Sequence, residues 1–117
     1  MKYILLIYHN EASRKAIEAD FESIAGEVDT IIQELTATGE WVGGDGLGVE
    51  AKSVRVRNGV PAITDGPYLE AKEYLAGYSI VDCESMERAL EIAARWPDSR
   101  FTGLEVRPLM GEGGEEM

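Results

Sequence analysis

The sequence predicts an α+β fold, in the form of a ferredoxin-like plan with a β-hairpin inserted in its middle. Three observations predict it: an opening strand that is apolar on both faces, two amphipathic helices separated by strands, and a hairpin signal at Asn58-Gly59. At 117 residues the chain is long enough for one core and too short for two. Residues 1–110 are therefore expected to form one domain, followed by a disordered, acidic, Gly-rich tail at 111–117.

The first two elements show different periodicities. Residues 2–9 are apolar on both alternating faces, which is typical of a strand that is covered on both sides. A helix follows, which begins between Ala12 and Asp20 and ends at Gly39, a natural C-terminal stop. Its apolar stripe advances in steps of three and four residues and consists of Ile17, Phe21, Ile24, Val28, Ile31, Ile32 and Leu35.

The middle of the chain predicts short strands joined by turns. Residues 40–42 are typical of a short strand, and residues 43–48, with four glycines, are expected to form an irregular crossover. This crossover lacks the Gly-Lys-Ser/Thr ending of a phosphate-binding loop. Residues 53–57 alternate between polar and apolar side chains, and residues 60–64 form the return strand, where Pro61 indicates an edge position.

The C-terminal half predicts a strand, a helix and a last strand. Residues 75–81 form the strand, and Ser85 is placed to cap a helix over residues 86–96. Pro97 follows, as is common beyond a helix end. Residues 101–109 close the fold, because apolar and charged side chains alternate in this segment.

The count of elements predicts a dimer. Two helices can cover only one face of the sheet, whereas the opening strand is apolar on both. A second copy of the sheet is the economical cover for the remaining face. We therefore expect a homodimer with two sheets packed face to face.

Composition excludes several classes of partner. The formal net charge is −11, and the few arginines are too dispersed to bind a phosphate backbone, so nucleic acid is not expected as a partner. The apolar run from Tyr3 to Tyr8 is too short for a membrane span or a signal peptide, so a cytoplasmic protein without membrane contact is expected. Cys83 is the only cysteine, which excludes an intrachain disulfide and multi-cysteine zinc sites. No metal or cofactor is expected.

The candidate site lies where the return strand ends, at Asp65-Gly66-Pro67. Loops that connect strands often carry binding residues, although Asp-Gly-Pro is also ordinary turn chemistry. Glu70 and Lys72 follow, as either a charged pair at a pocket mouth or an ordinary loop or dimer salt bridge.

A second group of candidates lies elsewhere in the chain. His9, the only histidine, ends the opening strand, where Asp65 could orient its tautomer; a routine strand-end hydrogen bond is the alternative. His9 and Asp65 are the candidate general bases. Arg55 points outward from its strand, toward either an anionic ligand or solvent.

The segment Asp65-Gly66-Pro67-Tyr68-Leu69-Glu70-Ala71-Lys72-Glu73 resembles the Asp-Gly-Pro-Phe-Ala-Glu-Thr-Lys-Glu signature of the YCII-related domain family, in its DGPF branch. Tyr68, Leu69 and Ala71 depart from that signature. Further segments that match the family are residues 1–8, 43–47, 54–59 and 105–109.

The resemblance implies a dimeric α+β barrel. Some members of the wider family are proposed to use a His-Asp pair, with the histidine on the first helix and the aspartate just before a proline near the end of the second. Val28 and Trp96 stand near these positions, so that pair is expected to be absent. The DGPF branch is often found beside extracytoplasmic-function sigma factors, which suggests a regulatory or accessory role.

Three functions follow from these observations. The first is a dimeric small-molecule-binding sensor or accessory protein with a pocket near the Asp65-Gly66-Pro67 loop. The second is a lyase- or isomerase-type enzyme with Asp65 or His9 as general base. The third is a protein-interaction module with an acidic surface, linked to sigma-factor regulation.

Overall fold

The computed structural model describes residues 1–66 and 73–111. Its elements, in chain order, are β1 (Lys2–His9), α1 (Glu11–Ala19), α2 (Phe21–Thr38), β2 (Trp41–Gly46), β3 (Ala51–Arg57), β4 (Val60–Gly66), β5 (Tyr74–Asp82), α3 (Met86–Arg95), the 3₁₀ helix η1 (Pro97–Arg100) and β6 (Leu104–Pro108). Four strands form an antiparallel sheet in the order β2-β5-β1-β6. This is the strand order of a ferredoxin-like fold, so the predicted α+β class is confirmed.

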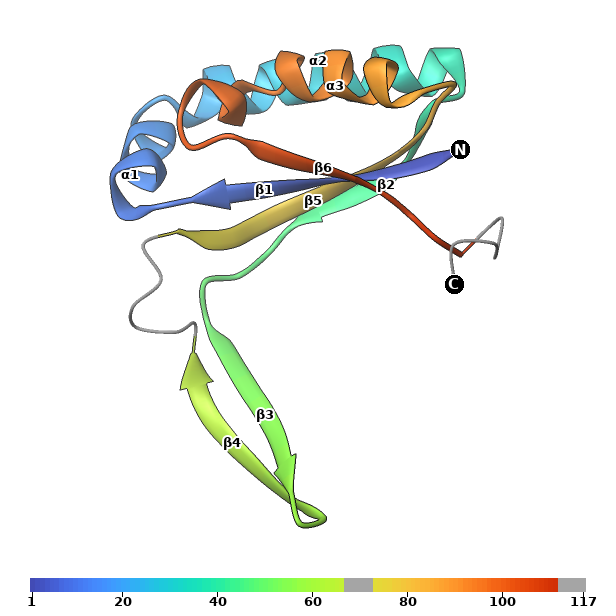
Figure 1. Cartoon of the computed structure of the whole chain (residues 1–117). Coiled ribbons are helices and arrows are strands. Elements are labelled where there is room, and N and C mark those ends of the chain that lie inside the picture. The colour runs from blue at the N-terminus through green and yellow to red at the C-terminus, as the bar shows by residue number, and fades with distance from the viewer. Residues whose placement is uncertain (67–72, 112–117) are drawn as a thin grey trace.

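The helices all lie on one side of the sheet (Figure 1). Leu5 of β1 is fully buried against this layer, together with Leu35 of α2 and Ile92 of α3. Trp96 closes the core beyond α3, and its ring stacks on Trp41 of β2 at 6.2 Å between centroids. Among the described residues, no helix is both long enough and apolar enough to span a bilayer.

The other face of the sheet is apolar along its two central strands and carries none of the helices of residues 1–66 and 73–111. β1 alternates, so that Ile4 and Leu6 point away from the buried face and are only half-buried. They lie opposite Ile80 and Tyr78 of β5, which are half-buried as well. The structure therefore agrees with the predicted two-sided opening strand.

The predicted first helix is two helices. Asn10 starts α1 with a capping box, in which its side chain accepts a hydrogen bond from the Ser13 backbone N–H at 2.8 Å. α1 ends at Asp20, after which α2 begins at Phe21 and runs to Thr38. Gly39 ends α2 in the left-handed conformation, as predicted.

The prediction of an irregular crossover over residues 43–48 is wrong for its first four residues. β2 continues through Gly46 and pairs with β5. A Cβ at Gly44 would lie 2.5 Å from the Tyr78 carbonyl oxygen, so glycine permits the close approach of these two strands. The last strand is shorter than predicted, because the η1 helix and a turn occupy residues 97–103.

The predicted hairpin is confirmed. β3 and β4 pair around Asn58-Gly59, where both residues have positive φ, and they form a separate two-stranded sheet. This sheet extends away from the helix-free side of the main sheet (Figure 1). We call residues 51–66 the arm and the rest of the described chain the body. The predicted disordered tail falls on residues 112–117, apart from Gly111, and these lie outside the described residues.

Candidate functional site

His9 lies at the end of β1, where it forms a close pair with Asp98. Its Nε2 lies 2.7 Å from Asp98 Oδ2. Only 15% of the His9 side chain and 12% of the Asp98 side chain are exposed. A hydrogen bond this short between largely buried partners fixes the position of the imidazole.

The topology brings these two residues together across 89 positions of sequence. β6 runs antiparallel to β1, and Leu104 at its start pairs with Ile7 near the end of β1. η1 comes just before β6, so its residues are delivered to the same end of the sheet as His9.

The Asp98 carboxylate is held by a rigid turn. Pro97, the first residue of η1, is fully buried. The Asp98 carbonyl oxygen accepts hydrogen bonds from the backbone N–H groups of Phe101 and Gly103, each at 3.1 Å. Gly103 has a φ of +106°, which allows the chain to turn back into β6.

α1 is tied to the same turn. The Thr102 hydroxyl donates to Ser13 Oγ at 2.8 Å, and Ser13 is buried. Ser13 in turn donates to the backbone carbonyl of Asn10, the residue after His9. These bonds join the end of β1, α1 and the η1 turn into one unit around the pair.

The pairing assigns distinct roles to the two imidazole nitrogens. A carboxylate only accepts hydrogen bonds, so in the neutral ring Nε2 carries the proton toward Asp98. Nδ1 is then the basic nitrogen of His9. In enzymes, an aspartate bonded to histidine in this way fixes the tautomer and orients the imidazole as a general base. The same pairing can orient the imidazole as a hydrogen-bond acceptor.

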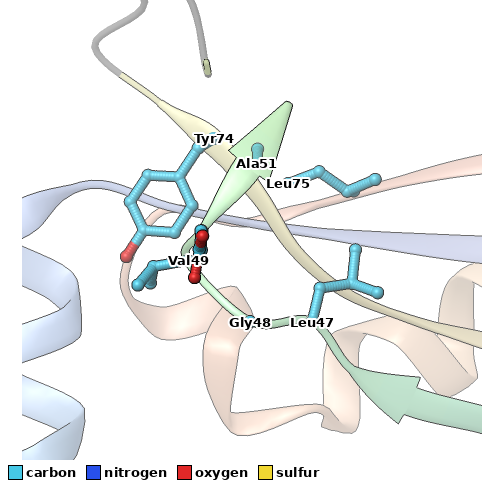
Figure 2. Close-up of a pocket in the computed structure, with 7 residues that line it drawn as sticks. Leu47, Gly48, Val49, Ala51, Tyr74 and Leu75 are labelled. Carbon is cyan, nitrogen blue, oxygen red and sulfur yellow. The ribbon is translucent and has the colours of Figure 1, made fainter. Parts of the chain in front are cut away.

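Tyr74 connects the pair to two hollows in the surface. Its ring meets the His9 ring edge-on, with 6.3 Å between centroids and 78° between planes. One hollow has a volume of about 440 Å³ and is lined by residues 47–51, Tyr74 and Leu75 (Figure 2). Another, of about 420 Å³, is lined by Glu11, Arg14, Val49 and Tyr74. Both volumes fall in the range of small-molecule sites.

Most residues that line the first hollow are apolar, and Glu50 is the charged residue among them. Leu47, Val49 and Leu75 gather around it with Tyr74, and Ala51 stands where β3 begins (Figure 2). Ala51 pairs with Gly66, so this hollow adjoins the start of the Asp65-Gly66-Pro67 loop, near which a pocket is predicted.

The predicted approach of Asp65 to His9 is replaced by a different pairing. Asp65 lies on the arm, and its Oδ1 accepts a hydrogen bond from Lys52 Nζ at 2.6 Å. Its side chain is 89% exposed. The body supplies Asp98 to His9 instead, because η1 ends beside β1 whereas β4 belongs to the separate sheet.

Two of the other predicted site residues, Gly66 and Arg55, lie on the arm. Gly66 ends β4 and is half-buried, and Arg55 lies in β3 opposite Ala62. Pro67, Glu70 and Lys72 lie outside the described residues. Within residues 1–66 and 73–111, no three His, Cys, Asp or Glu side chains gather as a metal site would require.

Sequence reasoning missed Asp98 and Tyr74. The family pattern places the aspartate before Pro97, where this chain has Trp96. The aspartate that bonds to His9 is Asp98, which follows this proline. The predicted topology could have pointed to Asp98. Because the last strand pairs antiparallel with β1, a residue shortly before that strand must lie near the end of β1. A His-Asp pair is therefore present, built from other positions than those the resemblance implied.

A second ion pair stabilises the opposite end of the body. Arg88 of α3 donates to both carboxylate oxygens of Glu40, at 2.9 and 2.8 Å. These hydrogen bonds from Arg88 lower the pKa of Glu40 to about 2, despite partial burial that opposes the shift. Burial raises the pKa of the nearby Cys83 thiol, which leaves it a poor nucleophile.

Comparison with known proteins identifies the class. The YCII-related domain model matches residues 1–111, and the chain therefore belongs to the YCII-related family. It is also similar to "Uncharacterized protein R00369" from Rhizobium meliloti (strain 1021), with 31% identity over 93% of this chain and 92% of that protein. Assignment to the DGPF branch remains a prediction from the signature at residues 65–73.

Proposed function

We propose that this YCII-related protein is a homodimeric small-molecule-binding protein that serves as a sensor or accessory protein. Its ligand lies in the hollow beside Tyr74, near the start of the Asp65-Gly66-Pro67 loop, with His9 as the polar recognition group. The observation that carries this proposal is the His9–Asp98 hydrogen bond of 2.7 Å, which the Tyr74 ring links to a mostly apolar hollow.

The surroundings favour a small ligand with an apolar body and one polar group. Leu47, Val49, Leu75 and the Tyr74 ring supply apolar surface, whereas Arg14 and Glu11 supply charge at the neighbouring hollow. Apolar walls with a few convergent polar groups are typical of ligand sites. His9, which contacts Tyr74 edge-on, is held in place by Asp98, a largely buried partner.

The dimer is supported by the helix-free face of the sheet. Ile4, Leu6, Tyr78 and Ile80 form an apolar strip across the two central strands of that face. A two-fold axis through this strip would pack the same strip of each copy against that of the other, as in an isologous interface. The resulting object is the dimeric α+β barrel expected from the sequence.

A fragment screen tests the ligand site. We expect small aromatic and aliphatic carboxylic acids, phenols and amides, screened by ligand-observed NMR, to include binders that are lost in Tyr74→Ala and weakened in His9→Ala. Leu90→Ala is the matched control, because Leu90 is an exposed apolar residue on α3. Binders that respond equally to Tyr74→Ala and Leu90→Ala would contradict the assigned site.

The His9–Asp98 pair also favours a second function, that of a lyase- or isomerase-type enzyme. His9 Nδ1 would take a proton from a carbon beside a carbonyl group, and Asp98 would stabilise the imidazolium that forms. The carboxylate of Asp65, the other candidate base, is bonded to Lys52 and mostly exposed, which gives it weaker support.

Isotope exchange distinguishes the enzyme from the binding protein. Carbonyl-containing fragments that bind are incubated with the protein in D₂O, and deuterium at the adjacent carbon is followed by NMR. An enzyme would incorporate deuterium, with loss in His9→Gln and retention in Asp65→Asn. Binding without incorporation supports the sensor or accessory function.

A further inference from the structure

The arm has an exposed surface that the body does not cover. Every side chain of residues 51–66 is exposed except those at Ser53 and Gly66, which are half-buried. The chain has a radius of gyration of 16.3 Å, whereas a compact chain of this length has about 13 Å. The arm, which extends from the body in Figure 1, accounts for this expansion.

Strand register divides the arm into an apolar and a polar face. Val54 lies opposite Ile63, and Val56 lies opposite Pro61, so these four side chains share one face. Val54 and Ile63 are 64% and 67% exposed. The opposite face carries Arg55 and Arg57 together with Val60, Ala62 and Thr64 of β4, whereas the Lys52–Asp65 pair lies at one end of the apolar face.

Such a ribbon requires a packing surface. A two-stranded hairpin alone is marginally stable in water, and it becomes stable when its apolar face is buried against another element. The arm is well formed over seven residue pairs, yet none of its large apolar side chains is covered. Its amphipathic pattern is that of a ribbon that lies on a surface.

The direction of the arm indicates which surface is available. It extends from the side of the main sheet that carries no helix (Figure 1). This is the side that the proposed homodimer uses, so a second copy stacked on the sheet would lie beside the arm.

Charge favours the same partner. The arm contains three basic residues, Lys52, Arg55 and Arg57, and one acidic residue, Asp65. The rest of the chain contains 21 acidic and 8 basic residues. The basic arm is therefore complementary to the acidic body of another copy, where the exposed Asp45 and Glu105 lie on the helix-free face together with Arg107.

We propose that each arm clasps the second copy of the chain and packs its Val54–Ile63 face on the body of that copy. This inference rests on the proposed homodimer and adds a second contact to its sheet-to-sheet interface. Because Ala51 at the base of the arm lines the hollow beside Tyr74, the clasp also fixes one wall of the ligand site.

Two adjacent substitutions test the clasp. Ile63→Glu places a charge on the apolar face, whereas Ala62→Glu places the same charge one residue away on the opposite face. Sedimentation equilibrium should show a dimer dissociation constant at least about tenfold higher in Ile63→Glu, because each dimer loses two buried isoleucines. Ala62→Glu should stay within about twofold of the parent protein.

The outcomes separate the clasp from the dimer. A parent protein that is monomeric at tens of micromolar would overturn both proposals. A dimer whose dissociation constant is unchanged in Ile63→Glu would overturn the clasp and leave the sheet-to-sheet dimer standing.

Hydrogen exchange of the parent protein provides a measurement that does not depend on any variant. Backbone amides of residues 51–66 should exchange more slowly above the dimer dissociation constant than after dilution below it. Exchange in the arm that is independent of concentration, in a protein that sedimentation shows to dimerise, would contradict the clasp.

Discussion

The body and the arm consist of equally regular strands, but they differ in what covers them. In the body, β1 is packed beneath α2 and α3, and Leu5 is fully buried. In the arm, β3 and β4 form all their mutual pairs while Val54 and Ile63 stay exposed. Strand pairing is therefore enough to form the hairpin. Its position relative to the body becomes fixed only when the apolar face of the hairpin is buried.

The two predicted catalytic residues fall on opposite sides of this division. His9 belongs to the body, where Asp98 and Tyr74 hold it from two directions. Asp65 belongs to the arm, where its partner is an exposed lysine on the neighbouring strand. A residue with several tertiary partners is better placed to recognise a ligand, which is why the proposed site is centred on His9.

The largest expected effect is a core truncation in the body. Leu5→Ala should lower the free energy of unfolding by about 3 kcal/mol, because it leaves a cavity under the helices. Val54→Ala in the arm should change it by less than about 0.5 kcal/mol at concentrations where the chain is monomeric. Urea unfolding of both variants measures the comparison, and similar losses would show that the arm is part of the folded core.

A smaller effect is expected from the close approach of β2 and β5. Gly44→Ala should lower the free energy of unfolding by about 2 kcal/mol, since its Cβ would meet backbone of Tyr78 and Ser79. Gly43→Ala is the matched control, because a Cβ there has no atom within 4 Å. Thermal unfolding compares the two, and equal shifts would contradict the tight contact.

The Glu40–Arg88 pair should contribute somewhat less. Glu40→Gln removes a charge-assisted interaction between partly buried groups and should lower the free energy of unfolding by about 1.5 kcal/mol at neutral pH. The folded-state pKa of Glu40 is about 2, below its ordinary value of 4.5, so this contribution is complete above pH 4.5. It is lost as pH falls from 4.5 toward about 2, where the parent protein and the variant should converge.

The exposed pair of Glu27 and Arg100 provides the control for this prediction. Both side chains are about half exposed, so Glu27→Gln should have a much smaller effect than Glu40→Gln. Urea unfolding of both variants along a pH series makes the measurement. A difference between the parent protein and Glu40→Gln that persists unchanged at about pH 2 would contradict the assigned cause.

At the site itself, the expected effect on stability is smaller than that of Glu40→Gln. Asp98→Ala should lower the free energy of unfolding by about 1 kcal/mol through loss of one hydrogen bond. Its clearer readout is the tautomer of His9, measured by ring ¹⁵N NMR at alkaline pH. The parent protein should carry the proton on Nε2, and Asp98→Ala should show a mixture. An unchanged tautomer would mean that Asp98 does not orient the ring.

Much of the fold could be predicted, because its signals are local. The opening strand at residues 2–9 and the Asn58-Gly59 hairpin follow from side-chain alternation and turn chemistry. Residues 43–46 were mistaken for an irregular crossover, because glycines have no side chains to show alternation. α1 was not separated from α2 in the prediction, because the apolar spacing continues from Ile17 to Phe21 across the break at Asp20.

The site was harder to predict than the fold. His9 could be chosen from the sequence as the only histidine at a strand end. Its partner could not be chosen by motif, because Asp98 is 89 residues away in a short 3₁₀ helix. The contact exists through the pairing of β6 with β1, a long-range feature that no local pattern encodes.

The most direct test of the account is ligand-induced chemical shift change, mapped by NMR on the body and the arm. We predict that a fragment from the screen changes the chemical shifts of the His9 ring nitrogens and the Tyr74 ring protons, and those of residues 47–51 in parallel. Shifts confined to the arm around Asp65, with His9 and Tyr74 unchanged, would contradict it.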